Sequence, residues 1–187
     1  MNEWNNLQKV LKNKQRILVI GPNGAGKSTF ATMLGESLAI NVFHLDKIFW
    51  EKNWEHLSEQ EFEQKLDGIL NSEDPYIIDG DYFSSLKKRV ERADLVIWLK
   101  IPGFICIKNI VKRRFKYMFK KRPDMAEGCN EKLSLSFLNY ALKYNKRSGK
   151  PTEILLKNIH ENNLFIINSN KSFKMYCHLL AESKLLK

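Results

Sequence analysis

The most restrictive feature of this 187-residue sequence is a glycine-rich run directly after four apolar residues. Residues 17–20 read Ile-Leu-Val-Ile, and residues 21–28 read Gly-Pro-Asn-Gly-Ala-Gly-Lys-Ser, which matches G-x-x-x-x-G-K-[ST]. The order predicts a buried strand, a tight turn and the start of a helix. Backbone N–H groups of such a turn point inward and bind phosphate oxygens, and the helix dipole favours an anion there. The sequence therefore predicts a nucleotide-phosphate site.

The residues of this loop have distinct expected roles. We expect Lys27 to reach the β- and γ-phosphates of ATP, and the Ser28 hydroxyl to bind Mg²⁺. The predicted ATP-binding residues are Gly21, Asn23, Gly24, Ala25, Gly26, Lys27, Ser28 and Thr29.

The remaining apolar runs predict a parallel sheet. They are continuous rather than alternating, which is typical of strands buried on both faces, and helical segments separate them. We therefore expect a three-layer α/β/α P-loop fold with a five-stranded parallel sheet. The expected strands are residues 16–20, 41–45, 76–79, 94–99 and 163–168, and the expected helices are residues 27–38, 58–70, 84–91, 103–119, 133–146, 152–160 and 171–185.

The length suits a single domain over residues 1–187. Trp4, Leu7, Val10 and Leu11 follow helical spacing near the start of the chain, with lysines opposite. We interpret this segment as a helix docked on the domain rather than a membrane-surface anchor.

Composition excludes several other classes of protein. No apolar run approaches the roughly 20 residues of a membrane span, and the first residues do not form a secretory signal. The three cysteines, Cys106, Cys129 and Cys177, are widely spaced without a C-x-x-C pair. A disulfide framework or a cysteine zinc site is therefore not expected, and we predict a cytoplasmic protein without a membrane partner.

The positive charge of the chain is concentrated in one segment. Lys and Arg outnumber Asp and Glu by 31 to 21, and residues 100–122 contain nine basic and no acidic residues. Lysines recur at every fourth position and repel one another by a few tenths of a kcal/mol per pair. A solvated helix face and a phosphate-binding surface both explain this stripe, which consists of Lys108, Lys112, Lys116 and Lys120.

The same segment carries apolar residues at spacings of three and four. This pattern predicts a helix with one buried face. The residues of the predicted face are Phe104, Ile107, Val111, Phe115 and Met118.

Aspartates follow two of the predicted strands. Asp46 ends the second strand, and Asp79 and Asp81 end the third. Ligands of open parallel sheets gather at the carboxyl ends of the strands, and Mg²⁺ prefers one or two carboxylates together with phosphates. We expect Asp79 to bind Mg²⁺ together with Ser28, although a turn or cap role would also explain an aspartate at this position.

Several motifs together resemble one family. They resemble the adenylate-kinase-like P-loop proteins known as DNA topology modulation proteins, within the nucleoside monophosphate kinase-like superfamily, over most of the chain. The motifs are residues 21–28, His44-Leu45-Asp46 with Phe49, Trp50 and Trp54, residues 77–82, and residues 122–129.

This resemblance implies further functional segments. In the family, a substrate-binding helical segment follows the second strand, which corresponds to residues 47–72, and a mobile basic lid corresponds to about residues 112–130. Asp79 matches the Asp of the family's strand-end Asp-Gly pair. The resemblance places phosphate-binding arginines at Arg113, Arg114 and Arg122 in the lid region and at Arg147 on the following helix.

The sequence also departs from the family pattern. Adenylate kinases continue the Asp-Gly pair with Phe-Pro-Arg, whose arginine binds the acceptor phosphate, whereas this chain has Asp81-Tyr82-Phe83. The acceptor therefore need not be AMP. Only Cys129 lies where some adenylate kinases hold zinc with four cysteines, so we expect no structural zinc.

These features predict a small-molecule kinase that transfers the γ-phosphoryl group of ATP, with Mg²⁺, to a nucleotide, nucleoside or similar acceptor. A phosphate acceptor needs no base, whereas a hydroxyl acceptor needs one, and Asp46 or Asp81 would supply it. The predicted substrate-binding residues are Asp46, Phe49, Trp50, Asp81 and Tyr82.

Two other functions fit the phosphate loop. A nucleic-acid-binding ATPase would use the basic helix on a phosphate backbone, although no known nucleic-acid-binding motif supports it. A nucleotide-dependent regulatory protein would bind ATP without transfer. The sequence is consistent with a monomer or a homodimer.

Overall fold

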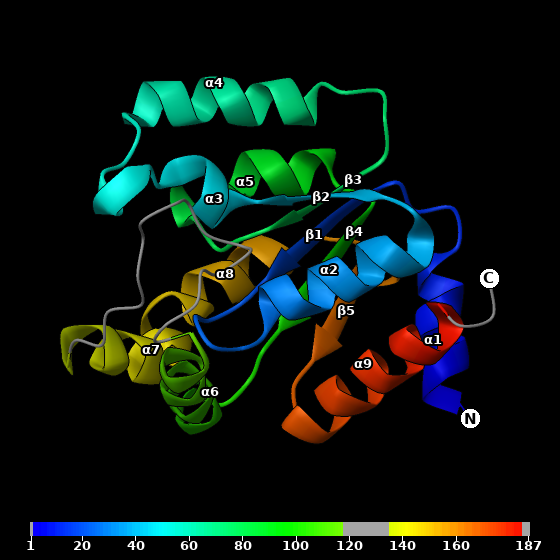
Figure 1. Ribbon diagram of the computed structural model, residues 1–187. Coiled ribbons are helices and arrows are strands. Elements are labelled where there is room, and N and C mark those ends of the chain that lie inside the picture. Colours follow the sequence, from blue (N-terminus) through cyan, green and yellow to red (C-terminus); the bar gives the residue numbers. More distant parts are fainter. Residues whose placement is uncertain (1, 118–134, 185–187) are drawn as a thin grey trace.

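The computed structural model describes residues 2–117 and 135–184, which contain a sheet of five parallel strands (Figure 1). The strand order is β2-β3-β1-β4-β5, so β1 is central. The predicted α/β fold with a five-stranded parallel sheet is confirmed. The strands are β1 (Arg16–Ile20), β2 (Asn41–His44), β3 (Tyr76–Asp79), β4 (Leu95–Leu99) and β5 (Leu164–Ile167).

Side chains of the inner strands enter two hydrophobic cores, because successive residues of a strand point to opposite faces of the sheet. Ile17 and Val19 of β1 belong to one core, and Leu18 and Ile20 belong to the other. All residues of β3 and β4 are buried. The apolar runs of β1, β3 and β4 therefore correspond to strands covered on both sides, whereas the edge strands β2 and β5 are only partly buried.

Helices cover both faces of the sheet (Figure 1). Helices α1, α2 and α9 pack on the first core, and α4, α5 and α8 pack on the second. The helices are α1 (Asn2–Leu11), α2 (Lys27–Leu38), α3 (Leu45–Phe49), α4 (Glu59–Leu70), α5 (Phe83–Arg92), α6 (Gly103–Lys116), α7 (Leu135–Arg147), α8 (Gly149–Leu156) and α9 (Asn170–Lys184), with 3-10 turns η1 (Lys52–Trp54) and η2 (Glu161–Asn163).

The N-terminal helix is docked as predicted, since Leu7 and Leu11 are buried in the first core. Within residues 2–117 and 135–184, no helix combines the length and hydrophobicity that crossing a bilayer requires.

Some local features differ from the helices predicted by periodicity. The short helix α3 and the turns η1 and η2 were not among those helices, because three to five residues are too few to display a helical period. Helix α8 begins at Gly149 instead of residue 152. Pro151 lies in its first turn, where a missing backbone N–H costs no intrahelical hydrogen bond.

The buried face of α6 is not the predicted one. The predicted face comprised Phe104, Ile107, Val111, Phe115 and Met118, of which Met118 lies outside the described residues.

The structure instead fully buries Cys106 and Ile110, while Phe104 is 66% and Phe115 is 70% exposed; Ile107 and Val111 are half-buried. Helix α6 turns this other side toward the loop after β1. The segment contains two apolar stripes at helical spacing, and spacing alone does not tell which of them faces the protein.

Two substitutions on α6 test this assignment. Ile110→Ala should lower the free energy of unfolding by about 2–5 kcal/mol, because it removes buried methyl groups and leaves a cavity. Phe104→Ala, on the exposed side, should change it by less than about 1 kcal/mol. Urea unfolding followed by circular dichroism measures both values. A larger loss for Phe104→Ala than for Ile110→Ala would contradict the observed orientation.

Candidate active site

The parallel register brings several strand ends together at one edge of the sheet. Val19 of β1 pairs with Asp79 of β3, and Asp79 pairs with His44 of β2. The loop after β1, the loop after β3 and helix α3 all start from this edge. It is the edge at which parallel α/β sheets bind ligands.

The loop between β1 and α2 requires glycine where its backbone approaches α6. Gly24 has a φ of 85°, in the left-handed region that favours glycine. A Cβ atom at this position would overlap the carbonyl oxygen of Cys106. The side-chain amide of Asn109 donates a hydrogen bond to the Gly24 carbonyl oxygen at 2.9 Å. Helix α6 therefore supports the loop from outside.

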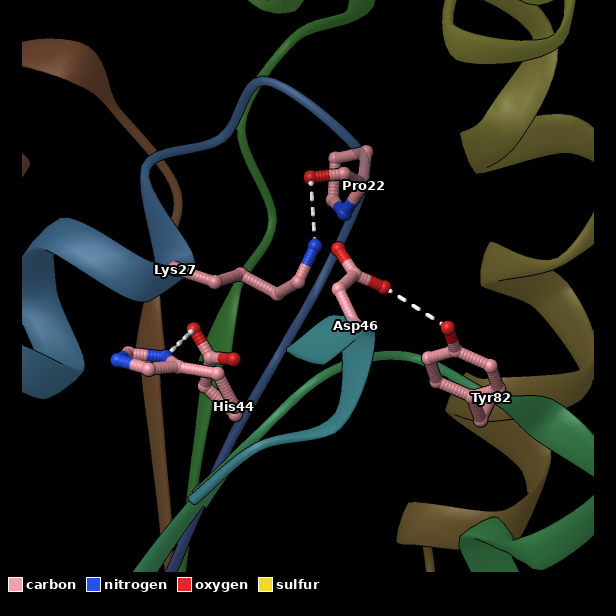
Figure 2. A network of polar contacts seen from close by, with 6 residues as sticks. Pro22, Lys27, His44, Asp46 and Tyr82 are labelled. Atoms are coloured by element: carbon pink, nitrogen blue, oxygen red, sulfur yellow. Dashed lines mark hydrogen bonds and ion pairs between the residues drawn. The ribbon is translucent and has the colours of Figure 1, made fainter. Parts of the chain in front are cut away.

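The N-terminus of α2 presents unpaired backbone donors to a ligand. Its N-cap residue is Gly26, which supplies no side-chain hydrogen bond to the first turn. The first N–H groups and the positive end of the helix dipole are thus free to interact with an anion. The Nζ atom of Lys27 donates to the Pro22 carbonyl oxygen at 3.2 Å, which folds the lysine back over the loop (Figure 2).

A cavity of about 700 Å³ opens beside this helix end. Its lining comes from the loop and from α2, α3, α6 and α9, together with His44 of β2. Gly21 and Ala25, two predicted ATP-binding residues, do not line it, and Ala25 is buried. The other predicted ATP-binding residues all do: Asn23, Gly24, Gly26, Lys27, Ser28 and Thr29.

Basic side chains of α6 form part of the wall of the same cavity. Lys112, Arg113 and Lys116 line it, whereas Lys108 is exposed and does not. Arg114 is half-buried and is not part of the lining. Helix α6 thus gathers positive charge opposite the phosphate loop. Arg122 lies outside the described residues, together with most of the predicted lid.

Asp79 and Ser28 offer oxygen atoms that suit Mg²⁺. Asp79 is only 3% exposed. Its Oδ2 atom lies 3.2 Å from Nδ1 of His44 and makes no hydrogen bond within the described part of the chain. A buried carboxylate oxygen of this kind, with a hydroxyl and phosphate oxygens, matches the ligands that Mg²⁺ prefers.

No group of three or more His, Cys, Asp or Glu side chains forms a metal site among residues 2–117 and 135–184.

A buried arginine holds the loop after β3 in place. Arg89 of α5 is fully buried, and its guanidinium donates to the carbonyl oxygens of Gly80, Asp81 and Tyr82 at 2.8–2.9 Å. It also donates to Ser85 Oγ. Burial lowers the pKa of Arg89 to about 10, and the charge of Asp81 partly offsets this effect. The planar guanidinium holds five N–H donors in fixed directions, so it can bind three carbonyl groups that point in different directions. The single ammonium group of a lysine could not bind all three in this way.

Two tyrosines bind the candidate acceptor-site aspartates. The Tyr82 hydroxyl donates to Asp46 Oδ1 at 2.9 Å (Figure 2), and the Tyr144 hydroxyl of α7 donates to Asp81 Oδ1 at 2.6 Å. Burial raises the pKa of Tyr82 above its ordinary value, and the nearby Asp46 carboxylate raises it further. Tyr82 therefore remains a protonated donor at neutral pH.

The aromatic residues after β2 pack mainly on one another. Phe49 stacks on His56 with ring centroids 5.2 Å apart and meets Trp50, Phe62 and Tyr82 at tilted or edge-on angles. Phe49 and Trp50 are half-buried. Neither Phe49 nor Trp50 lines the cavity at the phosphate loop, and Phe49 packs beside Tyr82, whose hydroxyl binds Asp46.

Arg147 lies in a different place from the other predicted phosphate-binding residues. It lines a second, shallow groove with Phe83 and Ile154, and not the cavity at the phosphate loop. Contact between Arg147 and a phosphate on the loop would therefore require a movement of α7.

Three residues of this site were not singled out from the sequence. Asn109, Arg89 and Tyr144 act through hydrogen bonds to other segments. An arginine within an otherwise amphipathic helix gives no signal of burial. The sequence stretch around Tyr144 likewise resembles any helix with an apolar face.

No protein-family model matches the chain, and no curated protein matches it either. Solved structures do match. One of them is a deoxyadenosine kinase from M. mycoides with bound dATP. The match covers 91% of this chain and 99% of the deoxyadenosine kinase chain, at 17% sequence identity and a TM-score of 0.54.

A shikimate kinase from Acinetobacter baumannii in complex with shikimate is also similar. The match covers 93% of this chain and 97% of the shikimate kinase chain, at 16% sequence identity and a TM-score of 0.51. A gluconokinase from Sinorhizobium meliloti 1021 matches 90% of each chain, at 14% identity and a TM-score of 0.51. At these low sequence identities, the similarity shows only that the proteins share a fold. The chain has the α/β fold of small-molecule P-loop kinases.

Replacement of Arg89 tests the support of the loop after β3. Arg89→Met should lower the free energy of unfolding by about 3 kcal/mol or more, because three carbonyl groups lose their donor in a buried place. Arg92→Met on the same helix is the matched control, since Arg92 is exposed, and should cost less than about 0.5 kcal/mol. Equal values in chemical denaturation would contradict this role of Arg89.

Proposed function

We propose that this protein is an ATP- and Mg²⁺-dependent kinase that phosphorylates a small molecule. The observation that carries the proposal is the composition of one cavity: Lys27 of the phosphate loop, Arg113 of α6 and Asp46 of α3 line it together. It thus combines groups that bind a triphosphate with a carboxylate facing the same space (Figure 2). The fold shared with P-loop kinases supports this proposal.

Each side of the cavity has a role in the proposed reaction. The N-terminus of α2 and Lys27 bind the β- and γ-phosphates, and Arg113 neutralises charge on the transferring oxygens. Ser28 lines the cavity and the buried Asp79 does not; these two residues would hold Mg²⁺, which contributes charge neutralisation to phosphoryl transfer when it is bound. Asp46 faces the acceptor.

The other predicted arginines keep accessory roles in this proposal. Arg114 and Arg122 would add charge from the lid region, residues 112–130, and Arg147 would join them after a movement of α7. Closure of such a segment excludes water, which would otherwise hydrolyse ATP.

The fold does not specify the acceptor. Kinases named for deoxyadenosine, shikimate and gluconate share it with this chain. Membership of the DNA topology modulation group rests on the sequence motifs, and the comparisons add nothing to it.

The basic helix favours the kinase over the nucleic-acid-binding ATPase. Lys112, Arg113 and Lys116 line the cavity, so their charge can act on a ligand bound there, although Lys112 and Lys116 are also exposed. A nucleic-acid-binding protein would instead present this charge on an outer surface and lose affinity steeply with salt.

Substitution of Lys27 tests the donor site. Lys27→Met should lower the rate of phosphoryl transfer from Mg-ATP at least about 100-fold, because the transferring group loses its fixed cation. Lys65→Met is the control, since Lys65 is exposed on α4, and should retain full activity. Release of ADP in a coupled assay gives the rates.

ATP binding and nucleic-acid dependence decide between the kinase and its rivals. Calorimetry with Mg-ATP should detect binding to the unaltered protein. If ATP binds, no small molecule accepts a phosphoryl group, and DNA or RNA stimulates hydrolysis, the protein is an ATPase that acts on nucleic acid and the kinase proposal is wrong.

A further inference from the structure

Tyr82 connects the loop after β3 to a side chain of the cavity at the phosphate loop. Its hydroxyl donates a hydrogen bond to Asp46 Oδ1 at 2.9 Å (Figure 2). Asp46 lines that cavity, whereas Tyr82 does not. The Tyr82 hydroxyl can therefore act on a ligand in the cavity through Asp46.

The carboxylate of Asp46 needs such a partner to keep a fixed orientation. Asp46 belongs to α3, which has five residues, and a helix of this length is not stable by itself. Rotation of the carboxylate about its bond to Cβ is also weakly restricted in an aspartate. The hydrogen bond holds Oδ1 toward Tyr82 and turns Oδ2 away from the phenol, to the side of Lys27 (Figure 2).

The position of the Tyr82 side chain is itself fixed by other segments. The Tyr82 carbonyl oxygen accepts hydrogen bonds from the Arg89 guanidinium at 2.8 Å and from Ser85 Oγ at 3.2 Å. The ring packs against Phe49 and Phe62, with 5.1 Å between the ring centroids in each pair. A buried arginine and two aromatic rings thus determine where the hydroxyl lies.

The direction of the hydrogen bond between Tyr82 and Asp46 is also determined. Burial raises the pKa of Tyr82, and the Asp46 carboxylate raises it further, so the phenol keeps its proton at neutral pH. A carboxylate accepts hydrogen bonds and donates none. Tyr82 is therefore the donor, and Oδ2 of Asp46 can accept a hydrogen bond from a ligand in the cavity.

We infer that Tyr82 is a positioning residue that orients Asp46, and that Asp46 accepts a hydrogen bond from the molecule to be phosphorylated. This inference rests on the proposed kinase function. It narrows the acceptor to molecules with a hydroxyl or amino group. It also changes the predicted role of Tyr82, which acts through Asp46 instead of touching the substrate.

The inference holds for charged and uncharged acceptors alike. Basic side chains line the same cavity as Asp46, so an anionic group of the acceptor would also find partners there. These side chains are Lys27, Lys112, Arg113 and Lys116. Asp46 therefore orients the acceptor and does not select it by charge.

A transfer assay with radiolabelled ATP tests the inference. The acceptor panel is adenosine, deoxyadenosine, AMP, shikimate, gluconate and glucose, and the variants are measured on each compound that the unaltered protein phosphorylates. Asp46→Ala should lower kcat/KM for the acceptor about 100-fold, because a hydrogen bond to a charged group is lost. Tyr82→Phe should lower it about 10-fold and leave the KM for ATP within about 2-fold, since the carboxylate remains but is no longer fixed.

The double variant separates positioning from a purely structural role. Asp46→Ala combined with Tyr82→Phe should be about as active as Asp46→Ala alone, because two residues that act as a unit have non-additive effects. If Tyr82 only supports the fold, the two losses should multiply to about 1000-fold. A multiplied loss, or full activity of Tyr82→Phe, would overturn the inference and leave the kinase proposal intact.

Asp46→Asn tests the same geometry with Tyr82 unchanged. The asparagine keeps an oxygen for the Tyr82 hydroxyl and replaces the other oxygen by an N–H donor. Its activity should therefore fall as far as that of Asp46→Ala, and full activity of Asp46→Asn would contradict the role of Asp46.

Tyr76→Phe is the matched control for Tyr82→Phe. The Tyr76 hydroxyl is buried and has no hydrogen-bond partner within the described residues, so its removal should leave kcat/KM unchanged. Thermal unfolding of each variant checks the fold. Binding of ATP without transfer to any compound of the panel would overturn the kinase proposal together with the inference.

Discussion

The in-register parallel pairing of β1 with β3 and β4 is the constraint on which the site depends. Backbone hydrogen bonds align Val19 with Asp79 on one side and with Ile97 on the other. Because all strands run in the same direction, their carboxyl ends, and therefore the loops that follow them, meet at one edge. The phosphate loop, the buried Asp79 and the short helix with Asp46 are neighbours for this reason, although they are far apart in the sequence.

Two polar anchors then fix the loops at this edge. Asn109 ties α6 to the phosphate loop, and Arg89 ties α5 to the loop that carries Asp81. Burial of a guanidinium is costly and is tolerated only when each donor finds a partner. Arg89 therefore makes the conformation of the loop after β3 part of the core, so that packing of the second core and orientation of Asp81 depend on each other.

The fold could be predicted from the sequence, and the phosphate loop could be recognised in it, because their signals are local. Continuous apolar runs specify buried strands, and Gly24 and Lys27 lie within a single motif of eight residues. The partners of the acceptor site could not be predicted in the same way. Tyr144 and Asp81 are 63 positions apart, and only the packing of α7 brings them together. The buried face of α6 was predicted wrongly for a related reason. The helix carries two rows of apolar residues at helical spacing, and the spacing does not tell which row faces the protein.

The ammonium group of Lys27 has only a carbonyl oxygen as its partner in the described part of the chain, and no carboxylate lies within ion-pair distance of it. A phosphate group that binds at this loop would therefore not have to break a salt bridge of Lys27 with the described residues. It would exchange one neutral contact for a charge-assisted one, which is about twice as strong. Acidic side chains of the described residues consequently do not compete with an anion for the ammonium group of Lys27.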